Sequence, residues 1–535
     1  GQGFRKEIPG GMTNRVIIIG AGLAGLMAAL AARKEGASVL VVDRGPIGLG
    51  TNSALANGVM SGPSGTYGLE DYVRDTLRAG DGLNSGSRVR LTAREAPAAF
   101  RLLHSVGVPL RERGARRTVV SPDPRVIPGV TLMRKLAGYV RGLDGIHSLP
   151  GFCVTELLHR EGRACGVRGF NRKGEPLEIG GPAVVLAAGG AGAVWRRHDN
   201  QKRIMGQGYA LAARAGLPLL DMEFVQFYPL VLAEPGLPAL IVYPPFAGDA
   251  KLIDASGADL LARHGLADVN DAIVKKRDRF SALLFEESQA GGVFLDLRAV
   301  PAAAWGVHPL AIFRRFRFPF RERPVAVAPA AHFMMGGVRA AETGETDLAG
   351  LFACGEILWG LHGANRLGGN ALTECVVSGA LAGRFAAELA QGAATVPSPV
   401  PGAKPAAGPE DAGTAADYRA LRAALQEAAW RGAGIIRTED SMREALSALG
   451  GIEERLGRLA PGSAAEKLAH CDLRAGAVTL KAVLEAGIGR KESRGSFLRG
   501  DYPAQDDSRW RRNSCLRFDA GGGGFTVDYL PADDA

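Results

Sequence analysis

The segment His362–Leu372 (HGANRLGGNAL) sets one imidazole and one guanidinium in a glycine-rich stretch of backbone. Glycine has no Cβ, so a flat ligand can lie close against the chain there. Arginine carries a planar fork of donors that matches a carboxylate. The segment therefore predicts a site where a flat ligand and an anion meet beside Arg366. His362 is expected to be structural or to lie next to that ligand, and not to act as a catalyst.

A second chemical motif lies near the start of the chain. Val16–Ile19 is a short β-branched run that predicts a buried parallel strand, and Gly20–Gly25 (GAGLAG) follows it directly. An alanine-rich helix to about Arg33 and a strand ending at Asp43 come next. This order predicts a dinucleotide-binding βαβ unit, with a pyrophosphate at the helix N-terminus and the adenosine ribose at Asp43.

Later strands return to the same sheet. Ala183–Gly192 and Phe352–Glu356 each read as a buried strand that runs into a glycine turn. We therefore expect an α/β fold in which residues 12–230 and 326–390 form one discontinuous nucleotide-binding domain. The other expected parts are an inserted α+β domain at 231–325, a Pro/Ala/Gly-rich linker at 391–415, and a C-terminal helical bundle domain at 416–535 with an irregular basic tail.

Composition narrows the class of protein. A chain of 535 residues is too long for one core, and a net charge of +9 is modest at this length, so nucleic acid is not an expected partner. Phe313–Arg323 alternates arginine with phenylalanine, but we interpret it as an edge strand with solvated arginines and not as a nucleic-acid surface.

The cysteines and the apolar runs bear on compartment. Six scattered cysteines without a C-x-x-C pair predict reduced thiols, no metal or iron–sulfur cluster, and a cytoplasmic protein. The apolar run Val16–Ala32 contains three glycines and fits strand, turn and helix better than a signal peptide. We expect no membrane span.

With these residues placed, the chain resembles the succinate dehydrogenase/fumarate reductase flavoprotein family, which includes L-aspartate oxidase. The resemblance covers nearly the whole length, with motifs in family order. They are GAGLAG with Asp43, Ala187–Gly192 (AAGGAG), Asp221–Pro229 (DMEFVQFYP), Phe294–Leu297 (FLDL), His332–Val338 (HFMMGGV), Gly355 with Glu356, HGANRLGGNAL, and Arg490–Pro503 (RKESRGSFLRGDYP).

The resemblance implies bound FAD, a capping domain over the isoalloxazine, and hydride transfer between flavin N5 and a carbon beside a carboxylate. His332 and Arg366 would hold that carboxylate, and Arg277 would shuttle the proton. The residues expected to line FAD are Gly20, Gly22, Gly25, Asp43, Arg44, Asn52, Ser53, Asn57, Gly58, Ala188, Gly189, Glu356, Asn370 and Leu372.

Two departures from the family pattern affect the chemistry. Asn52 stands where the membrane-linked members carry the histidine that bonds FAD, so the FAD is expected to be non-covalent. The pocket for the second carboxylate also differs, with Tyr228 in place of a histidine and Val242 and Tyr243 in place of a T-E-G segment. An unpaired anion in a closed site is costly, so the substrate is expected not to be a plain C4 dicarboxylate.

Three functions stay open from the sequence. The first is an FAD-dependent oxidoreductase acting on the CH–CH bond of a carboxylic acid or its enoate. The second is L-aspartate oxidase. The third is a non-catalytic FAD-binding electron-transfer or assembly subunit. The family often works with a separately encoded iron–sulfur subunit, which would be a partner beside the small carboxylic acid.

Overall fold

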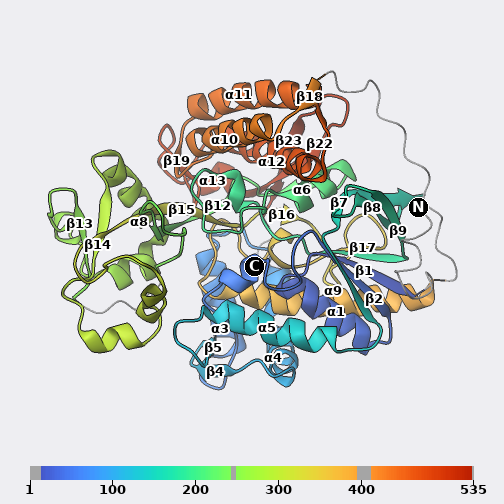
Figure 1. Ribbon diagram of the computed structural model, residues 1–535, viewed down its shortest axis with the longest axis horizontal. Helices are drawn as coiled ribbons and strands as arrows, with labels where there is room; N and C mark the ends of the chain where they lie inside the picture. The colour runs from blue at the N-terminus through green and yellow to red at the C-terminus, as the bar shows by residue number, and fades with distance from the viewer. Residues whose placement is uncertain (1–13, 243–248, 394–410, 533–535) are drawn as a thin grey trace.

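A parallel sheet of five strands lies at the centre of the domain expected to bind FAD (Figure 1). The computed structural model describes residues 14–242, 249–393 and 411–532. The strand order is β17–β10–β1–β2–β6, which places β1 in the middle of the sheet. The strands are β1 (Arg15–Ile19), β2 (Ser38–Asp43), β6 (Ile146–Pro150), β10 (Ala183–Leu186) and β17 (Leu351–Ala353). The predicted βαβ unit and both returning strands are confirmed.

Helices cover this sheet, and small sheets extend it. Helix α1 (Leu23–Lys34) packs along α9 (Asn370–Gly392), which begins inside the glycine-rich segment His362–Leu372. The remaining elements of this part are α1 (Leu23–Lys34), α2 (Asn52–Leu55), β3 (Val59–Ser61), α3 (Leu69–Ala79), α4 (Gly86–Ser105), β4 (Leu110–Arg113), β5 (Arg116–Val119), α5 (Pro128–Arg141), β7 (Cys153–Arg160), β8 (Arg163–Phe170), β9 (Pro176–Gly180), η2 (Gly192–Val194), α6 (Gln207–Arg214), β11 (Leu219–Leu220), β16 (Gly337–Val338), η5 (Gly355–Ile357) and α9 (Asn370–Gly392).

The inserted domain is built on an antiparallel sheet with its own core, and it projects to the left in Figure 1. Its strand order is β12–β15–β14–β13, and the long helix α8 packs on the sheet. The elements are β12 (Val225–Leu232), β13 (Lys251–Asp254), α7 (Leu260–Arg263), α8 (Val269–Gln289), β14 (Val293–Asp296), η3 (Ala302–Gly306), η4 (Leu310–Arg315) and β15 (Val325–Met334). Because β12 and β15 run through both domains, the exact boundaries near 230 and 326 stay a prediction.

The interpretation of Phe313–Arg323 as an edge strand is wrong. Its first residues complete the 3₁₀ helix η4, which ends at Arg315, and the rest is irregular chain. Phe313 is buried and stacks on Phe320 with ring centroids 4.7 Å apart. The alternation arises because phenylalanines in turns pack into the core of the capping domain, while the arginines between them are exposed.

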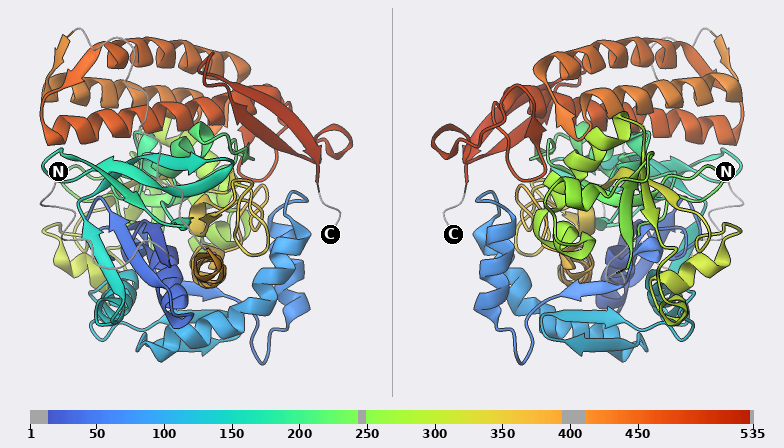
Figure 2. Two further views of the ribbon diagram at one scale, coloured as in Figure 1. Left: turned by 90° about the vertical axis from the view of Figure 1, so that its right-hand side faces the viewer. Right: turned by 90° about the vertical axis from the view of Figure 1, so that its left-hand side faces the viewer.

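Three long helices form the C-terminal domain, side by side in Figure 2. They are α10 (Ala415–Gly432), α11 (Glu439–Arg458) and α12 (Ala464–Gly489). Helix α10 ends at Gly432, and Thr438 caps α11 by accepting a hydrogen bond from the amide of Ser441. Most of the predicted linker, residues 394–410, lies outside the described residues.

The prediction of an irregular tail is wrong in part. Strands β22 (Arg512–Phe518) and β23 (Phe525–Pro531) form an antiparallel hairpin, and β22 pairs with β11 of the FAD domain. The short elements are β18 (Asp411–Gly413), β19 (Ile436–Arg437), β20 (Leu459–Pro461), β21 (Leu498–Arg499) and α13 (Asp507–Trp510). The overall class is as predicted: α/β with an α+β capping domain and a helical C-terminal domain. Of the helices in the described ranges, none is long and apolar enough to span a membrane.

A buried ion network fixes the chain just before β12. Arg490 and Glu223 are both fully buried, with Nε and Oε1 2.7 Å apart, and Arg490 also bonds Glu492. Burial raises the pKa of neighbouring Asp221 to about 7, with the Glu223 carboxylate adding to the shift. The network ties the C-terminal segment to the start of β12, which carries two residues of the site described next.

Candidate functional site

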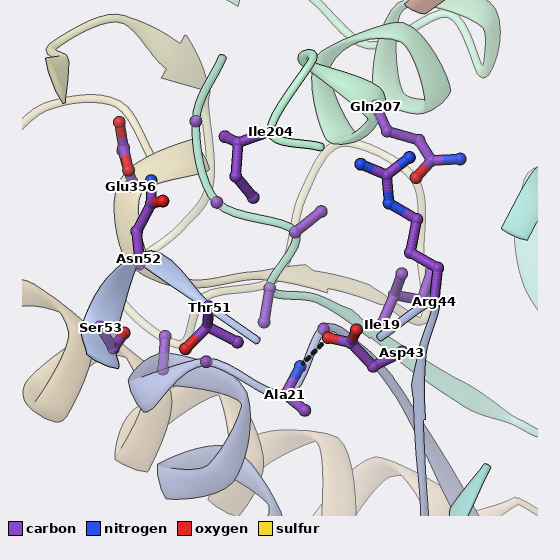
Figure 3. Close-up of a pocket in the computed structure, with 18 of the residues that line it drawn as sticks. Ile19, Ala21, Asp43, Arg44, Thr51, Asn52, Ser53, Ile204, Gln207 and Glu356 are labelled. Atoms are coloured by element: carbon purple, nitrogen blue, oxygen red, sulfur yellow. Dashed lines mark hydrogen bonds between the residues drawn. The ribbon is translucent and has the colours of Figure 1, made fainter. Parts of the chain in front are cut away.

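Glycines at the end of β1 shape the first of two adjoining cavities (Figure 3). A Cβ on Gly20 would lie 2.2 Å from the carbonyl oxygen of Ala187, and one on Gly25 would lie 2.0 Å from that of Gly20. These two glycines therefore serve the packing of strand against helix. Gly22 faces the cavity, and the nearest atom to its added Cβ is 3.5 Å away. Gly22 leaves room for a ligand at the N-terminus of α1, where the dipole favours a phosphate.

Asp43 lies beside this turn. Its Oδ2 accepts the amide of Ala21 at 2.8 Å and its Oδ1 accepts the amide of Gly45 at 2.6 Å (Figure 3). Each carboxylate oxygen has two lone pairs, so both can still accept from a ribose hydroxyl. Arg44 also lines the cavity, but its guanidinium pairs with Asp472 of α12. Arg44 thus lines the cavity, as predicted, and at the same time forms an ion pair with the C-terminal domain.

Glu356 stands at the junction of the two cavities, which also share Asn52, Ser53 and Cys375 in their walls. Its Oε1 accepts the amide of Met334 at 3.1 Å, and burial raises its pKa to about 8. A side chain that is protonated near neutrality can donate a hydrogen bond to a ligand hydroxyl. The joined cavities therefore suit one elongated ligand with a polar middle.

The second cavity brings together the three predicted catalytic residues. Arg277 of α8, His332 of β15 and Arg366 of the loop before α9 all line it. Predicted contacts Tyr228, Asn57, Gly58 and Leu372 line it as well. Ala188 and Gly189 line the first cavity, and Asn52 and Ser53 line both.

His332 is oriented by a carboxylate. Its Nδ1 lies 2.7 Å from Oδ2 of the buried Asp199, and because an ionised carboxylate only accepts, Nδ1 carries the proton. The Nε2 atom is then the free position of the ring for a ligand. The ring of Tyr228 lies 5.6 Å from that of His332, centroid to centroid. His332 is thus held in one ring orientation beside the cavity, and it donates from Nε2 to an anion when both ring nitrogens carry a proton.

Arg366 is held as firmly. Its Nη2 donates to Oε1 of Gln226 at 2.8 Å, and its guanidinium lies 4.7 Å from the centroid of the Phe333 ring. The residue is only 6% exposed, so its charge is largely withdrawn from water. A cation kept in that state attracts an anion far more strongly than a surface arginine does.

Arg277 reaches across from the capping domain. Its Nη2 donates to Oδ1 of Asn365 at 3.0 Å and to the carbonyl oxygen of Arg366 at 2.6 Å. Its Nε is buried and, within the part of the chain that the structure describes, has no hydrogen-bond partner. Burial raises the pKa of the adjacent Asp278, and the charge of Arg277 opposes that rise. The guanidinium therefore lines the same cavity as Arg366, and its Nε–H is a donor that these two bonds do not use.

Three predicted residues do not line either cavity. Val242 is fully buried, and its amide pairs with the carbonyl of Leu230 while its side chain joins the capping core. Asn370 is buried and donates from Nδ2 to Oγ1 of Thr76. Gly25 packs against Gly20, as described above. Tyr243, which was also expected in the substrate pocket, lies outside the described residues.

Several site residues were missed from the sequence. Asp199 and Asn200 support His332, Gln226 and Asn365 support the two arginines, and Ile241 closes the capping side. Asn365 and Gln226 both stand inside motifs quoted above, and the position of Asn365 next to Arg366 was the available signal. Nothing in the local sequence marks Asp199 or Ile241, because only the fold brings them to β15 and to the cavity.

The arrangement fits a flavin dinucleotide. The glycine turn and Asp43 offer a pyrophosphate and ribose site at one end, and the cations lie at the other. A model described as FAD binding domain matches residues 15–372, and one described as Fumarate reductase flavoprotein C-term matches residues 422–535. The chain belongs to the succinate dehydrogenase/fumarate reductase flavoprotein family.

Relatives agree along nearly the full length. The chain is 33% identical to the L-aspartate oxidase of Streptomyces coelicolor, covering 94% of this chain and 91% of the relative. It is 29% identical to one subunit of the fumarate reductase (CoM/CoB) of Methanothermobacter marburgensis, covering 94% and 96%. It is similar in structure to the FrdA protein of E. coli quinol fumarate reductase, with a TM-score of 0.83 at 25% identity over 98% and 97% of the two chains.

This flavoprotein is therefore an FAD-dependent oxidoreductase. FAD supplies a reversible two-electron hydride acceptor and donor. Gly22 and Asp43 line the first cavity and Glu356 lines both, and these are the residues that would hold it.

Proposed function

We propose that the protein interconverts a saturated carboxylic acid and its α,β-unsaturated partner, with the carboxylate beside the reacting bond held by Arg366 and His332. The convergence of these two residues and Arg277 on one cavity supports the proposal. In reduction, one alkene carbon receives hydride and the other gathers enolate-like charge with its carboxylate. A fixed guanidinium and an imidazolium that donates from Nε2, with its Nδ1–H bonded to Asp199, stabilise that charge where water is excluded.

Arg277 would deliver the proton that completes the reduction. It enters the cavity from α8, on the capping side, while Arg366 belongs to the FAD domain. A guanidinium holds its proton tightly at neutral pH, so the transfer requires immediate replacement of that proton from the buried groups around it. The hydrogen bonds to Asn365 and to the Arg366 carbonyl hold Arg277 in place for this.

The substrate has one carboxylate at the reacting end and a less polar or larger opposite end. Around this cavity, in the residues the structure describes, the arginine and lysine side chains are Arg277 and Arg366. Tyr228 and Ile241 line the capping side, and neither can neutralise a second carboxylate. Fumarate would therefore leave one anion poorly matched.

An anaerobic stopped-flow experiment tests this function. Dithionite-reduced holoprotein is mixed with fumarate, aryl acrylates and other monocarboxylic enoates, while reoxidation of the flavin is followed by absorbance. We expect faster reoxidation with a monocarboxylic enoate than with fumarate. Rapid reoxidation by fumarate alone would contradict the substrate assignment, and no reoxidation by any enoate would contradict the function and favour a non-catalytic electron-transfer subunit.

L-aspartate oxidation is the second candidate, because relatives with that name share 33% identity over most of this chain. Asn52 in the place of the flavin-bonding histidine fits a dissociable flavin. Production of hydrogen peroxide from L-aspartate by the purified protein would decide for it. In either case a separate electron-transfer subunit is a proposed partner, since the Methanothermobacter relative is itself named as one subunit of its reductase.

A further inference from the structure

A third cavity, of about 830 Å³, lies between the FAD domain and the capping domain, next to the second cavity. Leu55, Asp199 and Asn200 line both of them. The capping wall also runs from one to the other, because Val231 on the third cavity forms a β-bridge with Ile241 on the second. We call the third cavity the outer chamber.

The second cavity is small for a large substrate. Its volume is about 170 Å³, and the flavin ring would take part of that space. Pockets that enclose larger ligands measure roughly 300–1,000 Å³. A short enoate can stay inside the second cavity, whereas a longer acid has to continue past Leu55 into the outer chamber.

The capping side of the outer chamber is apolar. Strand β12 and the chain after it contribute Leu232, Leu237 and Leu240. Ile312 of η4 and Phe316, which follows that helix, complete this side. Leu237, Leu240 and Phe316 are only half-buried, so a ligand can cover the rest of their surface. Burial of hydrocarbon against such a wall removes apolar surface of both partners from water.

The FAD-domain side of the chamber carries cations. Arg197 and Lys202 line it and are exposed, and neither forms an ion pair within residues 14–242, 249–393 and 411–532. Glu234 lines the capping side, but its carboxylate is paired with Arg323 at 2.9 Å. The two cations are therefore available to an anion that enters the chamber.

We propose that the outer chamber binds the far end of an elongated substrate, an α,β-unsaturated acid with a hydrocarbon chain and a second carboxylate at its other end. The inference rests on the proposed function, because the first carboxylate must occupy the anion site of the second cavity for the chain to continue past Leu55. The hydrocarbon lies against Leu240 and Phe316. The second carboxylate is bound by Arg197 and Lys202. Fumarate has only two carbons between its carboxylates, so it stays inside the second cavity.

A series of acids of increasing length tests this assignment by reoxidation of dithionite-reduced holoprotein. The probes are crotonate, the eight-carbon and twelve-carbon trans-α,β-enoic acids, and the twelve-carbon α,β-enoic diacid. We expect kcat/KM to rise about tenfold or more from crotonate to the twelve-carbon acid, because hydrocarbon is buried. The diacid should gain about a further three- to tenfold from its second charge.

Matched variants separate the two contacts, each read as the ratio of kcat/KM between probes. Phe316→Ala should lose the gain with length, whereas Phe318→Ala should keep it, because Phe318 packs on the same capping core outside the chamber lining. Arg197→Gln combined with Lys202→Gln should lose the preference for the diacid over the twelve-carbon monoacid. Arg419→Gln, at an exposed position of α10, should keep that preference.

Two results would overturn the inference. One is a kcat/KM that does not rise from crotonate to the twelve-carbon acid in the wild-type protein. The other is a diacid that reacts no better than the monoacid in wild type, or that keeps its advantage in the double variant. The absence of reoxidation by every acid of the series, crotonate included, would instead contradict the proposed function itself.

Discussion

Replacement of Arg366 by methionine tests the anion site most directly. Arg366 is 6% exposed, donates to Gln226 and lies against the Phe333 ring, so water cannot take the place of its guanidinium in a filled site. Methionine keeps an unbranched apolar stem in contact with Phe333 and removes the charge.

The magnitude follows from burying a carboxylate without its partner. Removing one member of a buried ion pair costs roughly 3–5 kcal/mol. If that cost falls on the charge that develops in the transition state, the rate falls by about 10² to 10⁴-fold. Arg366→Lys should lie between wild type and Arg366→Met, because it keeps the charge but loses the planar fork.

The assay is reoxidation of reduced flavin by the best enoate, with flavin content measured on every variant. Arg384→Met is the matched control, since Arg384 lies on α9, is 44% exposed at its side chain and pairs with Glu388. It should leave the rate unchanged. A rate for Arg366→Met within tenfold of wild type, at normal flavin content, would refute the placement of the substrate carboxylate.

Three further predictions concern His332, Glu356 and the FAD linkage. Asp199→Asn removes the charged partner of His332 Nδ1, and a hydrogen bond to a charged group contributes roughly 1.5–3 kcal/mol. We therefore expect enoate turnover to fall by about 10- to 100-fold while the flavin content stays unchanged. An unaltered rate would exclude His332 as the donor. Glu356 has its folded pKa raised to about 8 from 4.5, so the folded state binds the extra proton between these values and stability falls as pH rises through that window. This difference in pKa corresponds to about 5 kcal/mol of unfolding free energy. The melting temperature of the apoprotein should therefore decline less from pH 5 to pH 8 in Glu356→Gln than in wild type. Equal declines would contradict the assignment of Glu356 as a buried, protonated acid. Acid precipitation of holoprotein should leave the yellow flavin in the supernatant because Asn52 cannot bond it, and a yellow pellet would show a covalent link.

The nucleotide-binding half was predictable because its signals are local. A strand, a glycine turn and a helix lie within Arg15–Lys34, and Asp43 follows at the end of the next strand. Of the three glycines, Gly20 and Gly22 line the first cavity, whereas Gly25 lines neither cavity and serves the packing of α1 against Gly20.

The tail and the capping contacts were harder to predict. Strand β22 forms because β11, far away in the chain, offers it an edge, and no local pattern shows that edge. Val242 was expected in the pocket because it stands in place of the family's T-E-G segment, yet its neighbour Ile241 lines the cavity and Val242 is buried in the capping core. A shift of one residue along extended chain reverses the side that a side chain faces.

The sequence by itself determined the cofactor class and the charged groups, because glycine spacing and residue type are properties of short segments. Only the tertiary structure decided which groups meet. It brought Arg277 from α8 to the carbonyl of Arg366 and placed Asp199 behind His332. These contacts join residues far apart in the chain, and their geometry depends on how three domains pack, which no local pattern encodes.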